Sequence, residues 1–388
     1  TFLDDQHGHG GPSQWFTALG FTYRGLVDGH NLTQLMAAIT ELQKLPGPKL
    51  LHIHTLKGKG YEPAENDPVG YHALAKIDPV ETVVTKHGAT YAQVFGQWVC
   101  DQADTDDRLM AITPAMIGGS GLEPFAQQHG NRLFDVAIAE QHALTLAAGM
   151  ACEGAKPIVA IYSTFLQRGY DQLIHDIVLQ DLDILLAIDR AGVVGEDGAT
   201  HTGAYDLAFL RCLPNLVVMA PSSAAETSAM LSFGFHHQGP AAVRYPRGEA
   251  FAELPLVTPI ELGKGQVLQT AIKPNAIAVL NFGALLDKAI VVAEAYDATL
   301  VDMRFVKPLD EALLHQLLNQ HMGFVTIEDH SCIGGAGSAV SEWLVQQESK
   351  VRLLCLGHED AALPHGSRDQ GLHHTGLSVT AMVAKVAE

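Results

Sequence analysis

Glu140 is the residue whose place in the sequence points most directly to chemistry. It stands between an apolar, strand-like run and a helix pattern rich in alanine and leucine, within residues 135–150. A carboxyl group in apolar surroundings has its charged form disfavoured, which equips it to hold or deliver a proton near neutral pH. The alternative is a structural glutamate that begins a helix, where its charge interacts favourably with the helix dipole. The residue pattern alone favours the structural alternative.

Polar and aromatic side chains also follow three predicted strands. Tyr162, Phe165 and Arg168 follow the first strand, Arg190 follows the second and Arg247 the third. Ligands bind beyond the carboxyl ends of strands in an open α/β sheet, and the planar guanidinium group suits phosphate oxygens. A lone arginine is most often a surface or ion-pair residue. Three arginines at equivalent positions, however, predict a site for a phosphorylated ligand on an otherwise acidic protein.

The glycine-rich loop 195–203 contains a carboxylate and an imidazole. Asp197 and His201 are predicted to form an orienting pair, in which the carboxylate fixes the ring and His201 moves protons near pH 7. A solvated loop is the alternative. The loop lacks a set of oxygen ligands for a metal, and the glycines of 334–337 lack the full dinucleotide-binding motif. We therefore predict no metal site, and we interpret 334–337 as a turn that opens a helix.

The elements that must position these residues alternate between apolar strands and helices, which predicts an α/β fold with parallel sheets. The first alternating unit is expected to contain helices 91–102, 140–150 and 168–180 and strands 109–112, 157–162, 183–188 and 216–219. The second is expected to contain strands 276–281, 298–303, 323–327 and 351–356 and helices 284–296, 310–319 and 336–347. The first 80 residues offer only helix 32–45 and strand 49–55, and they resemble the tail of another domain.

Composition limits the classes of function. The 388 residues suit two or three domains, and 47% hydrophobic with 17% charged residues is typical of a globular enzyme. A formal net charge of −19 gives no electrostatic support for binding to nucleic acid or to an anionic membrane. The five cysteines form no CxxC pair, and no apolar run is long enough to cross a bilayer. A soluble, cytoplasmic protein is expected.

Several long segments closely resemble the 1-deoxy-D-xylulose 5-phosphate synthase family of the transketolase superfamily. They are AEQHALTLAAGMA, IYSTFLQRGYDQ, DRAGVVGEDGATHTG, RYPRG and VDMRFVKPLDEALL. The resemblance implies a thiamine-diphosphate-binding fold. Its pyrimidine-binding domain would span 86–248 and its transketolase-like C-terminal α/β domain 249–388. Residues 1–85, from WFTALGFTYRGLVDGHN through HTLKGKGYEPAENDPVGYHA, resemble the end of the family's N-terminal diphosphate-binding domain and a linker.

The same resemblance implies roles around the cofactor. Glu140 would hydrogen-bond the aminopyrimidine ring and promote the ylid, and Phe165 would stack on that ring. Ile138 and Met116 would shape the bent conformation of the cofactor, and Lys57 would lie near it. Thiamine diphosphate and Mg²⁺ are therefore the expected cofactors.

The reaction that the resemblance implies condenses pyruvate with glyceraldehyde 3-phosphate, with loss of CO₂, to give 1-deoxy-D-xylulose 5-phosphate. This is a step toward isoprenoid precursors and thiamine, in which the cofactor is the electron sink. The residues implied on the substrate side of the pocket are Tyr162, Arg168, Arg190, Asp197 and Arg247. His72 and His201 match histidines that handle substrate and transfer protons. A homodimer is also implied.

One part of the family pattern does not occur in this sequence. The family's first domain supplies a histidine-bearing loop, and a Gly-Asp-Gly followed about 25–30 residues later by an asparagine that helps hold magnesium and diphosphate. The ligands of Mg²⁺ are therefore expected on an N-terminal portion that is cleaved off, truncated or a separate fragment. Without that portion, the isolated chain is expected to bind the cofactor weakly and to be inactive.

Two other functions remain open. A β-type subunit of a 2-oxo-acid dehydrogenase also takes its diphosphate site from another chain, but it would need neither the tail-like residues 1–80 nor the arginines that suit a phosphate. A non-catalytic remnant that dimerises with or regulates a full-length partner would not require the set of candidate catalytic and binding residues.

Overall fold

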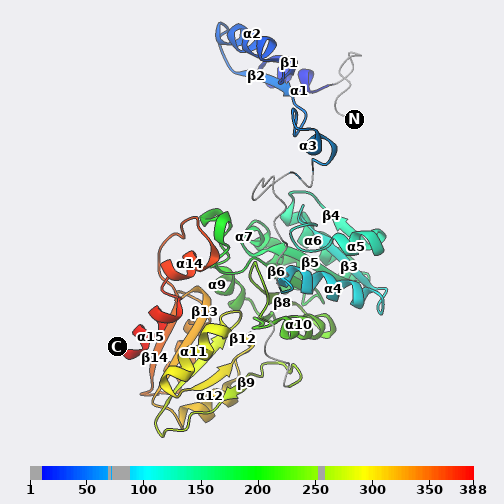
Figure 1. The fold of residues 1–388 in the computed structure, drawn as a ribbon. Helices are drawn as coiled ribbons and strands as arrows, with labels where there is room; N and C mark the ends of the chain where they lie inside the picture. The colour runs from blue at the N-terminus through cyan, green and yellow to red at the C-terminus, as the bar shows by residue number, and fades with distance from the viewer. Residues whose placement is uncertain (1–10, 69–70, 72–87, 252–257) are drawn as a thin grey trace. The chain divides into compact units, whose positions relative to one another are not determined.

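The computed structural model describes residues 11–68, 71, 88–251 and 258–388 (Figure 1). These residues form two units, divided after residue 85, and each unit is described by itself. No helix of the described residues is both long and apolar enough to cross a membrane.

The N-terminal unit is built around two parallel strands, β1 (Thr22–Asp28) and β2 (Lys49–His54). Helix α2 (Leu32–Gln43) connects them, and the short helices α1 (Pro12–Ala18) and α3 (Glu62–Asn66) flank them. The predicted helix 32–45 and strand 49–55 are confirmed, whereas β1 was missed. Its sequence, TYRGLVD, is interrupted by a glycine and shows a register shift, and only Val27 in it is buried, so it lacks a strand-like apolar pattern.

This unit leaves much of its apolar surface uncovered. Ten large apolar or aromatic side chains between residues 11 and 68 are exposed, among them Trp15, Leu32 and Met36, each more than 60% exposed. A two-stranded sheet is marginally stable by itself, because a third strand or further packing is normally needed to bury its faces. The two strands and their helices therefore leave these side chains without a covering layer among the described residues of this unit.

The second unit contains a seven-stranded sheet with the order β12-β7-β8-β6-β5-β3-β4. Its strands are β3 (Leu109–Thr113), β4 (Leu133–Asp135), β5 (Lys156–Tyr162), β6 (Leu185–Asp189), β7 (Val217–Met219), β8 (Ala241–Arg244) and β12 (Phe305–Lys307). All neighbours pair in parallel except β12, which comes from further along the chain and runs antiparallel to β7. The predicted α/β fold with a parallel sheet is confirmed.

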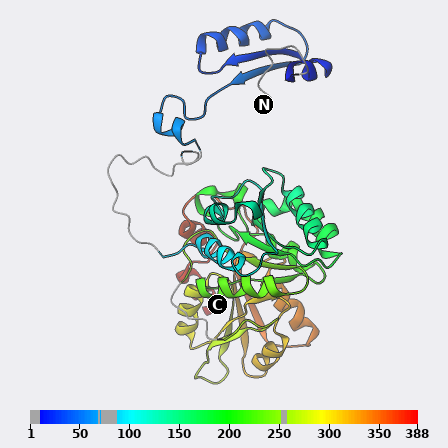
Figure 2. The ribbon, with the colours of Figure 1, turned by 90° about the vertical axis from the view of Figure 1, so that its right-hand side faces the viewer.

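Helices cover both faces of this sheet. On one face α4 (Tyr91–Ala103) and α10 (Ala224–His236) lie side by side, where Trp98 Nε1 donates to Ser232 Oγ at 2.8 Å (Figure 2). On the other face α6 (Glu140–Cys152) packs with the π-helical turn Leu173–Val178 in a second apolar cluster. The short helices α5 (Glu123–Gln128), α7 (Ser163–Leu166), α8 (Tyr170–Gln172) and α9 (Asp206–Arg211) complete this region.

A five-stranded sheet forms the rest of the second unit, with the order β14-β13-β10-β11-β9. Its strands are β9 (Gln266–Gln269), β10 (Ile277–Phe282), β11 (Thr299–Asp302), β13 (Gly323–Ser331) and β14 (Arg352–His358). Its helices are α11 (Leu286–Tyr296), α12 (Glu311–Leu318), α13 (Ala336–Gln346), α14 (Arg368–His374) and α15 (Val379–Ala387). The turn predicted at 334–337 does open a helix, because α13 begins at Ala336 with its first N–H groups donating to Glu328 at 2.7 and 2.8 Å.

Candidate active site

The carboxyl ends of adjacent parallel strands bring the predicted residues to one edge of the seven-stranded sheet. Tyr162, the last residue of β5, is in register with Asp189, the last residue of β6. Ile188 of β6 is in register with Arg244, where β8 ends three residues before Arg247. Segments that are far apart in the sequence therefore end side by side, at the edge where an open α/β sheet binds its ligands.

Glu140 is buried at the first position of α6. The turn before it is fixed by Asp135, whose Oδ1 accepts hydrogen bonds from the N–H groups of Ala115 and Ala137, each at 2.9 Å. The Glu140 side chain is 3% exposed, and its carboxylate accepts a hydrogen bond from Arg168 Nη1 at 2.8 Å. No side-chain hydrogen bond caps α6. Glu140 thus begins a helix, but its carboxylate is directed to an arginine that is 53% exposed.

The segment after β5 sets an aromatic group beside an arginine. Phe165 stacks on Tyr162 with ring centroids 5.6 Å apart, and the rings of Phe165 and His201 form a T-shaped pair with centroids 5.4 Å apart. The guanidinium of Arg190 lies over the Tyr162 ring, 4.1 Å from its centroid, a cation–π arrangement. Burial raises the pKa of the Tyr162 hydroxyl, although the charge of Arg190 acts in the opposite direction.

Asp197 joins two of the predicted arginines, Arg190 and Arg247. Its Oδ2 pairs with Nη1 of Arg190 and, at 3.0 Å, with Nη1 of Arg247. The predicted Asp197–His201 pair is wrong in this structure, because His201 Nδ1 lies 2.8 Å from the Thr200 hydroxyl instead. Asp197 instead pairs with two permanently charged guanidinium groups, of which that of Arg190 forms a charge-assisted hydrogen bond with the carboxylate.

The remaining predicted residues are distributed more widely. Met116 is 7% exposed in the same apolar cluster as Tyr162, whereas Ile138, in the turn before Glu140, is 73% exposed. Lys57 lies in the N-terminal unit, between β2 and α3, so its relation to this edge is not described. His72 lies outside the described residues.

Two contributors to this edge were not predicted from the sequence, Gly119 and Asp329. A Cβ atom at Gly119 would overlap the Tyr162 hydroxyl, so Gly119 leaves room for the end of that side chain. Asp329, on β13, accepts a hydrogen bond from the Val193 N–H in the loop after β6 at 3.0 Å. The glycine pair at 118–119 was a possible signal, but no local pattern links Asp329 to a loop more than a hundred residues earlier.

Asp189 is a buried acid directly beneath the arginines. It is 2% exposed, and its Oδ1 accepts a hydrogen bond from the Arg190 N–H at 2.6 Å. Burial raises the pKa of Asp189 to about 7, against the lowering effects of that hydrogen bond and of the arginine charges. Its charge therefore changes near neutral pH, next to groups suited to an anionic ligand.

Asp189→Asn is expected to gain stability over the unsubstituted protein as pH rises from about 4 to about 7. An aspartate in an unfolded chain has a pKa of about 3.9, whereas burial raises the pKa of Asp189 to about 7 in the folded state. Between these values the folded state binds more protons, so this carboxyl lowers stability progressively as pH rises. Urea unfolding of both proteins across this range measures the difference in their free energies of unfolding. Titratable groups that the two proteins share contribute equally to both and cancel from this difference. A difference independent of pH would contradict the prediction.

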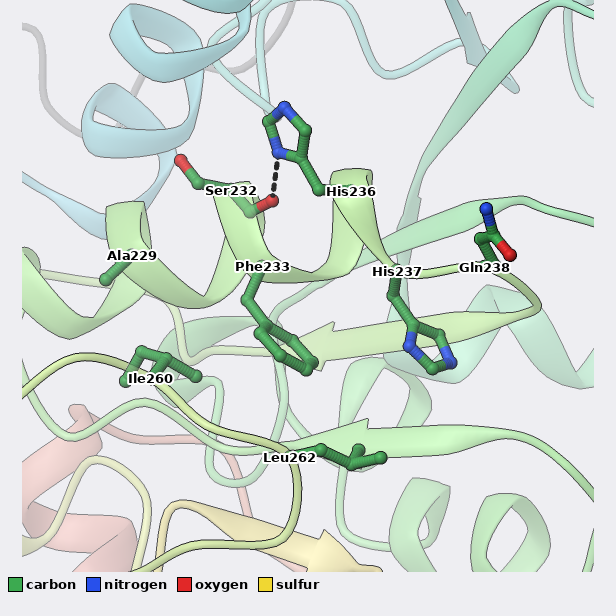
Figure 3. Close-up of a pocket in the computed structure, with 8 residues that line it drawn as sticks. All are labelled: Ala229, Ser232, Phe233, His236, His237, Gln238, Ile260 and Leu262. Carbon is green, nitrogen blue, oxygen red and sulfur yellow. Dashed lines mark hydrogen bonds between the residues drawn. The ribbon is translucent and has the colours of Figure 1, made fainter.

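A separate hollow of about 660 Å³ lies at the end of α10, and none of the predicted site residues lines it. Figure 3 shows the side chains of Phe233 and His237 extending to the side of α10 on which Ile260 and Leu262 lie. The ring of His236 lies 2.8 Å from the Ser232 carbonyl oxygen, an interaction within the helix itself. These groups give no convergent set of charges or nucleophiles.

The residues at the sheet edge fit one half of a thiamine diphosphate site. A buried carboxylate and the half-buried ring of Phe165 suit an aminopyrimidine ring, and the paired arginines suit a phosphate group. Among the described residues, no group of three or more His, Cys, Asp or Glu side chains could hold a metal ion. The part of the site that the structure describes is thus suited to the organic ring and an anionic substrate.

Comparisons with known proteins agree with this arrangement. Residues 87–251 match the transketolase pyrimidine-binding domain, residues 264–382 the transketolase C-terminal domain, and residues 5–55 the 1-deoxy-D-xylulose-5-phosphate synthase model. The synthase of Thioalkalivibrio sulfidiphilus is 54% identical over 97% of this chain, and that of Pseudomonas entomophila 53% identical over 97%. The chain spans only 59% and 60% of the length of these two curated relatives.

Two solved structures share the fold. One, titled as a split-gene transketolase in an inactive β4 tetramer, aligns with a TM-score of 0.69 and 28% identity, over 78% of this chain and 98% of that one. The transketolase of Campylobacter jejuni aligns with a TM-score of 0.66 over 97% of this chain and 68% of its own, at 14% identity. The second likeness concerns the fold alone.

Proposed function

Because the chain belongs to the 1-deoxy-D-xylulose-5-phosphate synthase family of the transketolase superfamily, we propose that it is the pyrimidine-binding and C-terminal part of such an enzyme. The reaction would be the thiamine-diphosphate-dependent condensation of pyruvate with glyceraldehyde 3-phosphate, with loss of CO₂. The observation that carries the proposal is the buried Glu140 carboxylate at the same sheet edge as the arginine pair. We assign residues 1–85 to the tail of the diphosphate-binding domain and a linker, 86–248 to the pyrimidine-binding domain and 249–388 to the C-terminal domain.

Glu140 and its neighbours would hold the aminopyrimidine ring. Thiamine diphosphate, when bound, supplies the carbanion equivalent and the electron sink. Glu140 would share a proton with a ring nitrogen, because its carboxyl group is buried and accepts only one charge-assisted hydrogen bond from Arg168 among the contacts described. Phe165 would pack on the ring, and Met116 and Ile138 would lie beside it. Lys57 remains a candidate from the N-terminal unit.

The arginines would bind the phosphate group of the aldehyde substrate. Asp197 holds Arg190 and Arg247 together before any ligand arrives, which lowers the conformational entropy that binding must overcome. Tyr162 supports Arg190 through its ring face. His201, whose ring forms a T-shaped pair with that of Phe165, and His72 would exchange protons with the substrates, and Arg168 would contribute positive charge near the carboxylate of pyruvate.

We further propose that a separate N-terminal portion completes the enzyme. The uncovered apolar surface of residues 11–68 supports this, because such surfaces normally mark contact sites. The split-gene transketolase neighbour provides a precedent for a divided enzyme whose one part is inactive. That portion would supply the ligands of Mg²⁺ and the diphosphate. A homodimer is proposed from the family resemblance, and a cytoplasmic location from the five unpaired cysteines.

Mixing the chain with a separately expressed N-terminal portion of the Thioalkalivibrio sulfidiphilus synthase, thiamine diphosphate and Mg²⁺ is expected to give CO₂ release from pyruvate that depends on glyceraldehyde 3-phosphate. Neither part should be active by itself, because each holds only half of the cofactor site. Mass spectrometry of the product and a CO₂ assay measure the reaction.

An acceptor comparison separates the alternatives. Acylation of a lipoyl domain in place of the aldehyde would identify a 2-oxo-acid dehydrogenase subunit. A complete absence of decarboxylation, in a mixture shown to be a folded complex, would contradict the enzymatic proposal and favour a non-catalytic remnant.

A further inference from the structure

The loop after β6, residues 190–203, is held by residues that do not belong to the seven-stranded sheet from which it extends. It carries three of the predicted site residues, Arg190, Asp197 and His201. The N–H of Val193 donates to Oδ1 of Asp329 at 3.0 Å. Asp329 lies on β13 of the five-stranded sheet and is 2% exposed. A carboxylate of the C-terminal part therefore fixes the backbone of a loop that belongs to the pyrimidine-binding part.

Asp329 is itself fixed as an anion. His358 Nε2 lies 2.9 Å from its Oδ1, and Arg368 Nη2 donates to its Oδ2 at 2.9 Å. Although burial opposes ionisation, these two partners hold the pKa of Asp329 below its usual range. The carboxylate fits directly against the loop, since a Cβ atom at Gly192 would overlap it. Gly192 also has φ +72°, a conformation that favours glycine.

Two further contacts hold the same loop. The side chain of Val193 is 2% exposed and belongs to the apolar cluster of the C-terminal part, which includes Leu356, Leu363 and Leu372. His365 Nδ1 lies 3.0 Å from the Glu196 carbonyl oxygen, next to Asp197. Backbone, side chain and tip of the loop are thus each anchored to the C-terminal part.

We propose that Asp329 is a positioning residue for the acceptor substrate, which sets the placement of Arg190 and Asp197 through the backbone of Val193. This inference rests on the proposed function for the identity of the substrate, but the contact itself does not. Asp329 touches no predicted substrate-binding side chain in the structure, so its effect would pass through the loop. Small displacements of binding groups are costly, because oriented contacts depend steeply on distance.

The test compares Asp329→Ala, the conservative Asp329→Asn and Val193→Ala, which keeps the backbone N–H but removes most of the side chain that packs in the C-terminal apolar cluster. Hydrogen–deuterium exchange of the folded chain is expected to show faster exchange in 190–203 for Asp329→Ala and Val193→Ala. In the reconstituted enzyme, KM for glyceraldehyde 3-phosphate is expected to rise about tenfold, while kcat and KM for pyruvate change little. Asp329→Asn retains an oxygen that can accept from Val193, so it should recover part of the loss.

Asp310→Asn is the matched control. Asp310 is a buried carboxylate of the same part of the chain, 5% exposed, and it caps α12 by accepting from Leu313 N–H at 3.0 Å. The Asp310→Asn substitution should lower thermal stability without altering hydrogen–deuterium exchange in residues 190–203. It should also leave KM for glyceraldehyde 3-phosphate unchanged relative to KM for pyruvate. Unchanged loop exchange in Asp329→Ala and Val193→Ala would overturn the inference, as would faster exchange with an unchanged KM for the aldehyde. If the unsubstituted enzyme does not use the aldehyde, the proposed function is wrong. Hydrogen–deuterium exchange in residues 190–203 would still test whether Asp329 holds the loop.

Discussion

Glu140→Gln is expected to lower kcat/KM of the reconstituted enzyme by about 10²–10⁴-fold, the usual contribution of a positioned proton-transfer group. Glutamine has nearly the same shape and can still accept a hydrogen bond from Arg168, but it cannot share a proton with a ring nitrogen as a carboxyl group does. The loss should appear in decarboxylation of pyruvate as well as in the full condensation, because both require the activated cofactor. Steady-state rates of CO₂ release measure it.

Glu153→Gln provides a control at the other end of the same helix. Glu153 is exposed at the C-terminal end of α6, so its substitution removes the same charge without reaching the sheet edge. Its activity should stay close to that of the unsubstituted enzyme, and the melting temperatures of both variants should be similar. If Glu140→Gln retained activity within about twofold, a range too small for a lost proton-transfer group, Glu140 would be a structural glutamate.

Arg304→Met is expected to lower the free energy of unfolding by about 3–5 kcal/mol, because it leaves a buried carboxylate without its counter-charge. The Arg304 side chain is 1% exposed, and its Nε donates to Glu226 Oε1 at 2.7 Å. The same guanidinium group binds Thr258 Oγ1 at 2.9 Å and the side-chain oxygen of Gln266. It therefore joins α10 to the segment that leads into the five-stranded sheet. Urea unfolding measures the loss.

The neighbouring acid gives this prediction a pH dependence. Burial, together with the charge of Glu226, raises the pKa of Asp302 well above its usual value. Without Arg304, the carboxylate of Glu226 loses its counter-charge and can be accommodated by taking up a proton. The loss in free energy of unfolding should therefore be smaller in acid than at neutral pH. Lys385→Met, which removes an exposed ion pair with Glu359, should cost less than about 1 kcal/mol. An equally small loss for Arg304→Met would contradict the prediction.

The sequence patterns predicted elements best where apolar runs were long and continuous. Strand 157–162 corresponds to β5, of which all but the first residue is buried. The helix predicted at 168–180 is instead a 3₁₀ turn at Gln167–Gly169, helix α8 and a π-helical turn at Leu173–Val178. Gly169 explains part of this, since a Cβ atom there would press on Leu144 of α6. Such a close helix contact is set by tertiary packing, which periodicity does not reveal.

The edge strands and the ion-pair partners could not be predicted from the sequence for a different reason. Strands β9 and β12 have four and three residues, too few to show an alternating pattern. Both pair antiparallel at the sheet edges, which an alternation of helices and strands does not indicate. The choice of Asp197 between His201 and the arginines likewise depends on distances across two strand ends, those of β6 and β8. The individual residue types were recognisable, but their partners were not.

The Val193 side chain packs in the apolar core of the C-terminal part, and this packing couples the stability of that core to ligand binding at the loop. Coupling between two sites acts equally in both directions, so a core that favours one loop arrangement is itself stabilised by any ligand that selects that arrangement. A phosphorylated substrate should therefore protect the five-stranded sheet against unfolding as well as the loop it touches. Conversely, substitutions among the leucines that share a cluster with Val193 should weaken substrate affinity as well as stability.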